Sequence, residues 1–163
     1  MMKKVLTGAV AALVAGALPL AAGALTGRFH GGGTLSNWTP ACINDGWVDT
    51  PERYEVRFHP RGVGSNRDRD SIAFFSGQHA MSFVLNGGDF SSAWQPVTHA
   101  FLGSGITAVD QNQPEAARIR ILSMWPNNLT ENTDQPVRIR GQIQHLAAAR
   151  WCRVDFDVIV QQR

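Results

Sequence analysis

The chain has 163 residues, of which 44% are hydrophobic and 17% are charged, and this composition excludes an intrinsically disordered protein. Two of its 15 basic residues, Lys3 and Lys4, lie in a predicted export leader, so the rest of the chain carries 13 arginines against 13 acidic residues. A chain with no net charge lacks the basic surplus of a nucleic-acid-binding protein or of a polybasic membrane anchor.

Residues 1–24 have the three parts of a secretory signal peptide. Lys3 and Lys4 precede an apolar stretch, Val5–Leu20, and the small residues Ala22–Ala24 form a cleavage site. The apolar stretch is about 16 residues long, shorter than the roughly 20 that span a bilayer. The sequence therefore predicts cleavage after the leader and export to the periplasm or the cell exterior, with no stable membrane anchor afterwards.

The segment that follows the leader, residues 25–33, contains Gly27 and the triplet Gly31–Gly33. Glycine adds conformational freedom and contributes no side chain to a core. We expect this segment to be a flexible lead-in, and we expect residues 34–163 to form a single domain.

The chain has only two cysteines, Cys42 and Cys152. Paired thiols persist in the oxidising compartments that an exported chain enters. The spacing fits neither a Cys-x-x-Cys redox pair nor a structural zinc site, which needs more ligands close together. We therefore predict one disulfide that joins the start of the domain to its last strand.

Alternation of apolar and polar residues dominates the remaining chain, and glycine, proline and asparagine separate the alternating segments. No segment outside the leader predicts an amphipathic helix of useful length. The predicted strands are Arg53–His59, Ser71–Ser76, Ala80–Leu85, Trp94–Phe101, Ala117–Met124, Val137–His145 and Trp151–Val160. The pattern predicts an all-β protein, an antiparallel β-sandwich of about seven or eight strands that resembles the immunoglobulin arrangement in outline, with a small barrel as the alternative.

The last two predicted strands allow a register to be proposed, because one alignment places apolar residues on one face and opposite charges on the other. That alignment places Cys152 on the buried face and turns Trp151 outward. It pairs Val137 with Val158, Ile139 with Phe156, Ile143 with Cys152, Arg138 with Asp157, and Arg140 with Asp155.

Two tryptophans are the predicted binding residues, because an exposed indole can stack on a sugar ring or anchor a protein partner. Trp151 is the first candidate, since it is predicted to face away from the core. Trp125 is the second, since it lies where a strand runs into a turn. Large aromatic residues more often fill cores, and that alternative stays open for each of them.

A weaker candidate is a cation loop at Asn66, Asp68 and Asp70, whose oxygen-bearing side chains alternate as in the opening of an EF-hand loop. The later positions do not fit that motif, so a solvated hairpin loop is the preferred interpretation and no metal site is predicted. No motif predicts a catalytic residue or a cofactor.

Arginines occupy alternate positions on two predicted strands, at Arg118 and Arg120 and at Arg138 and Arg140. They would make a shallow site for an acidic ligand if the strands were neighbours, although nearby aspartates favour an ordinary charge-balanced surface.

Two hypotheses about function follow from the sequence. The first is a non-catalytic exported module that binds a protein or glycan partner, or has a structural role, in the periplasm or at the cell surface. The alternative is an exported hydrolase or carbohydrate-active module with a site built from loops. A deep pocket with converging histidine and carboxylate groups favours the enzyme, and an exposed aromatic patch favours the binding module.

Overall fold

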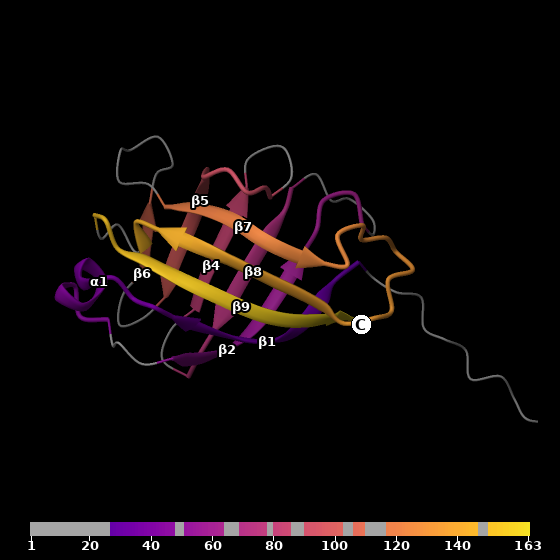
Figure 1. The fold of residues 1–163 in the computed structure, drawn as a ribbon, viewed down its shortest axis with the longest axis horizontal. Coiled ribbons are helices and arrows are strands. Elements are labelled where there is room, and N and C mark those ends of the chain that lie inside the picture. Colours follow the sequence, from indigo (N-terminus) through magenta and orange to yellow (C-terminus); the bar gives the residue numbers. More distant parts are fainter. Residues whose placement is uncertain are drawn as a thin grey trace, which may run out of the picture.

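The computed structural model of the chain describes residues 27–47, 51–63, 69–77, 80–85, 90–102, 106–109, 117–146 and 150–163. These residues form nine strands and one five-residue helix (Figure 1). The elements are β1 (Phe29–Ser36), α1 (Pro40–Asn44), β2 (Glu52–His59), β3 (Ser71–Phe75), β4 (Ala80–Leu85), β5 (Gln95–Leu102), β6 (Ile106–Val109), β7 (Arg118–Trp125), β8 (Val137–Gln144) and β9 (Arg153–Gln162).

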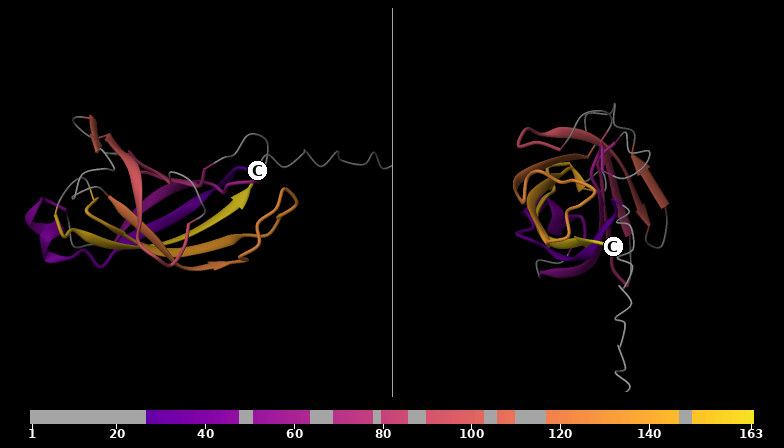
Figure 2. Two further views of the ribbon diagram at one scale, coloured as in Figure 1. Left: turned by 90° about the horizontal axis from the view of Figure 1, so that it is seen from above. Right: turned by 90° about the vertical axis from the view of Figure 1, so that its right-hand side faces the viewer.

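All strand pairs are antiparallel, and eight of the nine strands close into a ring. Hydrogen bonds connect the strands in the order β4-β3-β2-β1-β9-β8-β7-β5, and β4 also pairs with β5, while β6 is attached to β5 alone. In the right-hand view of Figure 2 the strands curve around a common centre. The predicted antiparallel all-β class is confirmed, and the choice between sandwich and small barrel stays a prediction.

The core lies inside this ring, where the alternating strands direct their apolar side chains. The ring of Phe74 on β3 is central, since it contacts Phe156 at 5.7 Å, Phe83 at 6.0 Å and Tyr54 at 6.1 Å between ring centroids. Phe156 comes from β9, so these aromatic contacts join strands from opposite sides of the ring. Tilted and edge-to-face contacts of this kind stabilise beyond the area that they bury.

The expected flexible lead-in is wrong for its second half, because Phe29–Ser36 forms β1 in the middle of the sheet. Gly31 pairs with Val56 of β2 and with Val160 of β9. A Cβ atom at Gly31 would overlap the carbonyl oxygen of Ile159, and one at Gly33 would overlap the side chain of Val158. The glycines therefore permit a close approach of β1 to β9, and they do not mark a linker. Residues 1–26, which include the predicted leader, lie outside the described residues.

The predicted hairpin of β8 and β9 is present, but its predicted register is wrong by two residues. Val137 pairs with Val160, and Ile143 pairs with Val154. A shift of two keeps each side chain on its predicted face, so the alternation could not distinguish the two alignments. Arg140 pairs with Asp157 in the observed register, and Cys152 lies in the turn before β9, where its carbonyl accepts a hydrogen bond from the His145 backbone N–H at 2.7 Å.

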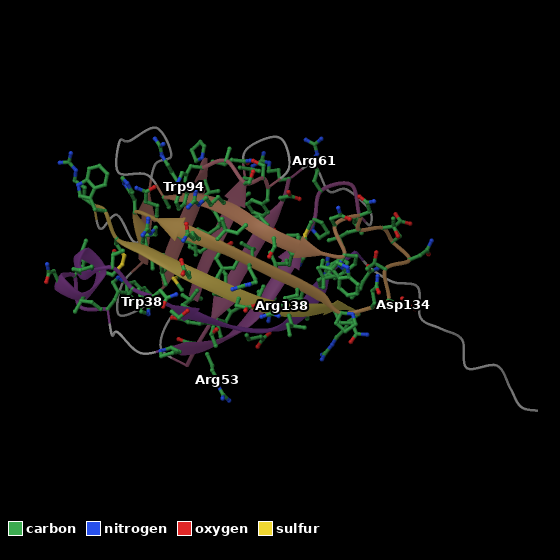
Figure 3. All side chains as sticks on the ribbon, viewed as in Figure 1. Trp38, Arg53, Arg61, Trp94, Asp134 and Arg138 are labelled. Carbon is green, nitrogen blue, oxygen red and sulfur yellow. A yellow bond between two sulfur atoms is a disulfide. The ribbon has the colours of Figure 1, made fainter. Side chains whose placement is uncertain are left out.

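The predicted disulfide is confirmed and joins α1 to the residue before β9. The Cα atoms of Cys42 and Cys152 are 4.5 Å apart, and both side chains are fully buried. Thr39 strengthens the junction, because its backbone N–H donates to the Arg153 carbonyl at 3.0 Å and its hydroxyl accepts from the Arg153 N–H at 2.9 Å. Figure 3 shows Trp38 at this end of the ring.

We expect Gly31→Ala to lower the free energy of unfolding by about 3 kcal/mol, since the new methyl group displaces the backbone of β9. The matched control is Gly32→Ala, where the nearest atom to the new Cβ is the Tyr54 carbonyl oxygen at 3.4 Å. We expect this control to change stability by less than about 0.5 kcal/mol in urea unfolding. Equal stability of the two variants would contradict the close approach of β1 and β9.

The disulfide closes a loop of 110 residues, which the chain-entropy model rates at about 4 to 5 kcal/mol. The double variant Cys42→Ala/Cys152→Ala should therefore unfold at a clearly lower urea concentration than the oxidised parent. Adding a reductant should move the parent to the same midpoint and leave the variant unchanged. A parent midpoint that does not respond to reductant would contradict a stabilising disulfide.

Candidate functional site

A pocket of about 360 Å³ opens at the end of the ring where β2 and β7 finish and β8 begins. Its lining combines apolar and polar side chains and comes from several segments that are far apart in the chain. The lining residues are Phe58, Pro60, Arg61, Val63, Asp70, Phe90, Ile121, Met124, Asn127, Asn128, Leu129 and Ile139. The mouths of closed β-sheets are common ligand sites, and this volume lies in the range of small-molecule pockets.

A bulge in β7 lies beside the pocket. The register of β7 against β8 shifts between Ile121 and Ser123, and only Arg118 and Ile119 of β7 pair with β5. At Ile121 the backbone N–H donates instead to the carbonyl of Ser91, at 2.8 Å. A β-bulge bends its strand, and the part of β7 beyond Ile119 has no paired residue in β5.

Asp70, the one residue of the candidate cation loop that the structure describes, fixes two loops beside the pocket. Its side chain is only 5% exposed. One carboxylate oxygen accepts the Arg61 backbone N–H at 2.5 Å, and the other accepts the Phe90 N–H at 2.6 Å. The Asp70 carboxylate therefore joins loops, while Asn66 and Asp68 lie outside the described residues. Within the described ranges, no cluster of three or more His, Cys, Asp or Glu residues is arranged to hold a metal.

The chemistry of the lining fits the binding of an apolar group. Phe58, Ile121 and Ile139 form buried parts of the pocket wall, and Asn127 and Asn128 are exposed near the opening. The lining residues include one carboxylate and no histidine. That carboxylate already accepts backbone N–H groups, and the described lining residues offer no second carboxylate or histidine to pair with it in general acid and base catalysis.

The two predicted binding tryptophans are both exposed, at opposite ends of the ring. Trp125, at the end of β7, is 68% exposed, and Trp151, in the turn before β9, is 62% exposed. The structure therefore does not bring them together in one site. Trp38 is buried and stacks on Trp47, with 4.9 Å between ring centroids.

Arginine and aspartate side chains form ion pairs on the outer face of β8 and β9. The Arg138–Asp157 pair was predicted from the sequence, whereas Arg140 lies beside Asp157 and not beside Asp155. The Arg138 guanidinium donates to both carboxylate oxygens of Asp157, at 2.9 and 2.6 Å, and Arg140 lies 3.6 Å from the same carboxylate. Hydrogen bonding by Arg138 lowers the pKa of Asp157 and raises the pKa of Arg138. A lowered carboxyl pKa stabilises the fold above the pKa of the unfolded chain, and that contribution is lost as the pH falls through the folded value.

The imidazole of His30, on β1, also has a perturbed pKa. Partial burial lowers this pKa, and the nearby positive charge of Arg57 lowers it further. The group is therefore mostly neutral at pH 7. It lies on the outer face of the sheet, away from the pocket lining, and supplies no group to the candidate site.

The chain matches no protein-family model, and neither a curated protein nor a solved structure is significantly similar to it. No helix among the described residues is long and apolar enough to span a membrane.

We expect Asp70→Asn to lower the free energy of unfolding by about 2 to 4 kcal/mol, because the new amide places a donor against a backbone N–H. Hydrogen exchange should show faster exchange at the amides of Arg61 and Phe90. Asp134→Asn, which changes an exposed carboxylate, serves as the control. Protection of both amides that equals that of the parent would contradict the role of Asp70.

Proposed function

We propose that the protein is an exported, non-catalytic binding module that holds an apolar group of its ligand in the pocket at the β7–β8 end of the ring. The pocket of about 360 Å³, whose buried wall includes Phe58, Ile121 and Ile139, is the observation that carries this proposal. Burial of an apolar group there releases ordered water from both surfaces, which favours binding. The exposed asparagines at the opening are suited to hydrogen-bond the polar remainder of such a ligand.

The lining supports binding over hydrolysis. The sequence led us to expect converging histidine and carboxylate groups in an enzyme pocket. Among the described lining residues Asp70 is the one carboxylate, and both of its oxygens accept hydrogen bonds from the backbone. Such a carboxylate acts as a structural acceptor and is poorly placed to exchange protons with a substrate.

Export is supported by the leader and by the disulfide. The predicted signal peptide at residues 1–24 would direct the chain out of the cytoplasm. The buried Cys42–Cys152 disulfide fits an oxidising compartment such as the periplasm or the cell exterior. A module in that location meets small apolar molecules, glycans and protein partners.

We expect Met124→Trp to weaken binding of the neutral fluorescent probe 1-aminoanthracene at least tenfold. Met124 is half-buried in the pocket wall, so a larger side chain there fills the pocket. Leu122→Trp is the matched control, because Leu122 lies in the same strand but is 54% exposed and does not line this pocket. Probe titrations of the folded variants provide the measurement.

The control should bind the probe within twofold of the parent, and both variants should retain the circular dichroism spectrum of the parent. Probe binding by Met124→Trp that equals the parent would place the apolar site elsewhere and contradict the proposal. A parent protein that does not bind the probe at all would contradict it as well.

A further inference from the structure

We propose a second binding site, for an acidic polysaccharide, on the outer face at the opposite end of the ring. We call it the arginine–tryptophan patch and define it by Arg118, Gln144, Arg150, Trp151 and Arg153. It is separate from the pocket, and none of its residues lines that pocket.

Three neighbouring strands place the first part of the patch in one row. Arg118 of β7 pairs with Gln144 of β8, and Gln144 pairs with Arg153 of β9. Both arginines are exposed, and their backbone positions flank that of Gln144. Adjacent strands are about 4.8 Å apart, so the arginine Cα atoms are separated by roughly 10 Å across the row. The strand order therefore makes β7, β8 and β9 neighbours, which the sequence alone did not establish.

The turn before β9 adds the second part of the patch. Trp151 is 62% exposed. The Arg150 guanidinium lies 5.5 Å from the centroid of its ring, and the ring centroids of Trp151 and His145 are 5.6 Å apart. The backbone of this turn is held by its neighbours, because the Thr39 hydroxyl donates to the Trp151 carbonyl at 3.2 Å and Cys152 is in the disulfide. Trp151 also has a positive φ of 66°, which is uncommon for a non-glycine residue. The turn therefore presents an indole in a fixed position.

The patch carries a local excess of positive charge. Among the described residues, no carboxylate forms an ion pair with Arg118, Arg150 or Arg153. The nearest aspartate in the next row, Asp155, accepts from Asn37 at 2.8 Å and from Gln142 at 2.7 Å. At the other end of β8, by contrast, Arg138 and Arg140 share Asp157.

Arg120 extends the patch on its β5 side. The guanidinium of Arg120 donates to the Gln142 side-chain oxygen at 2.9 and 2.5 Å and lies 4.5 Å from the Trp94 ring centroid. Figure 3 shows Trp94 near the start of β7. Planar guanidinium groups bind carboxylates and sulfates in a bidentate manner, and an exposed indole stacks on a sugar ring.

An acidic polysaccharide fits this combination better than other anionic polymers. Outside the leader the chain has equal numbers of basic and acidic residues, whereas a nucleic-acid-binding surface draws on a basic surplus. A membrane-binding surface inserts several apolar side chains beside its basic ones, but the patch exposes one indole among polar residues. A sugar chain with carboxylate or sulfate groups uses both the indole and the guanidinium groups.

The test is titration of the mature, oxidised protein with polygalacturonate, which carries carboxylates, and with heparin, which carries sulfates. Neutral dextran is the uncharged comparison, and quenching of tryptophan fluorescence is the readout. We expect Arg118→Gln/Arg153→Gln to weaken binding of the preferred acidic glycan at least tenfold. Arg53→Gln/Arg57→Gln, which removes two exposed arginines from β2, should stay within twofold of the parent.

Trp151→Ala should weaken binding as well, measured by calorimetry, while Trp151→Phe retains most of it.

Binding of heparin alone or of polygalacturonate alone identifies the acidic group and supports the site. The proposal is overturned if dextran binds equally well or if the control double variant loses as much affinity. It is also overturned if neither glycan binds, or if phosphatidylglycerol vesicles or single-stranded DNA bind more tightly through the same arginines. The Met124→Trp variant should bind the glycan normally, so this test is independent of the pocket.

Discussion

The pairing of β1 with both β2 and β9 is the constraint on which the rest of the structure depends. It joins the first strand of the described chain to the last and, together with the β4–β5 pairing, closes the ring. This contact brings together residues more than 120 positions apart, such as Phe29 and Gln162, so closure requires a large loss of chain entropy. The disulfide reduces that loss by linking α1, which follows β1, to the turn before β9. Gly31 and Gly33 then allow the two backbones to approach more closely than side chains would permit.

Much of the fold could be predicted from the sequence because most strands have one buried and one solvated face. All seven predicted strands are present, with ends within two residues of those observed. Alternation reports the face of a side chain but not its partner, which explains why the β8–β9 register was wrong by two while the faces were correct. β1 was missed for a different reason. Gly31–Gly33 carries no apolar alternation, and its role depends on the proximity of β9, which a local pattern does not encode. The short strand β6 was missed as well.

The candidate sites were less predictable than the fold, because their residues come together only through the topology. The pocket lining combines Phe58, Phe90, Met124 and Ile139 from four separate segments, and none of these residues has a distinctive local motif. Asp70 was noticed for its oxygen atoms, but its role as an acceptor for two loops depends on where residues 61 and 90 lie. Trp151 was a candidate because the proposed register turned it away from the core, and Trp125 because it lies where a strand runs into a turn, and both are exposed. The arginine row on β7 and β9 needed the strand order, which the sequence did not specify.

The two ends of the ring differ in a way that explains why one holds a pocket and the other a surface site. At the end near α1, the disulfide, Leu146 and Trp38 are all buried, and the proposed ligand site there lies on the outer face. At the other end, the β7 bulge and the loops held by Asp70 lie beside the pocket. Rigidity at the first end also has a functional consequence. A turn fixed by Cys152 and Thr39 loses little conformational entropy when Trp151 contacts a ligand, and such preorganisation increases affinity without any additional contact.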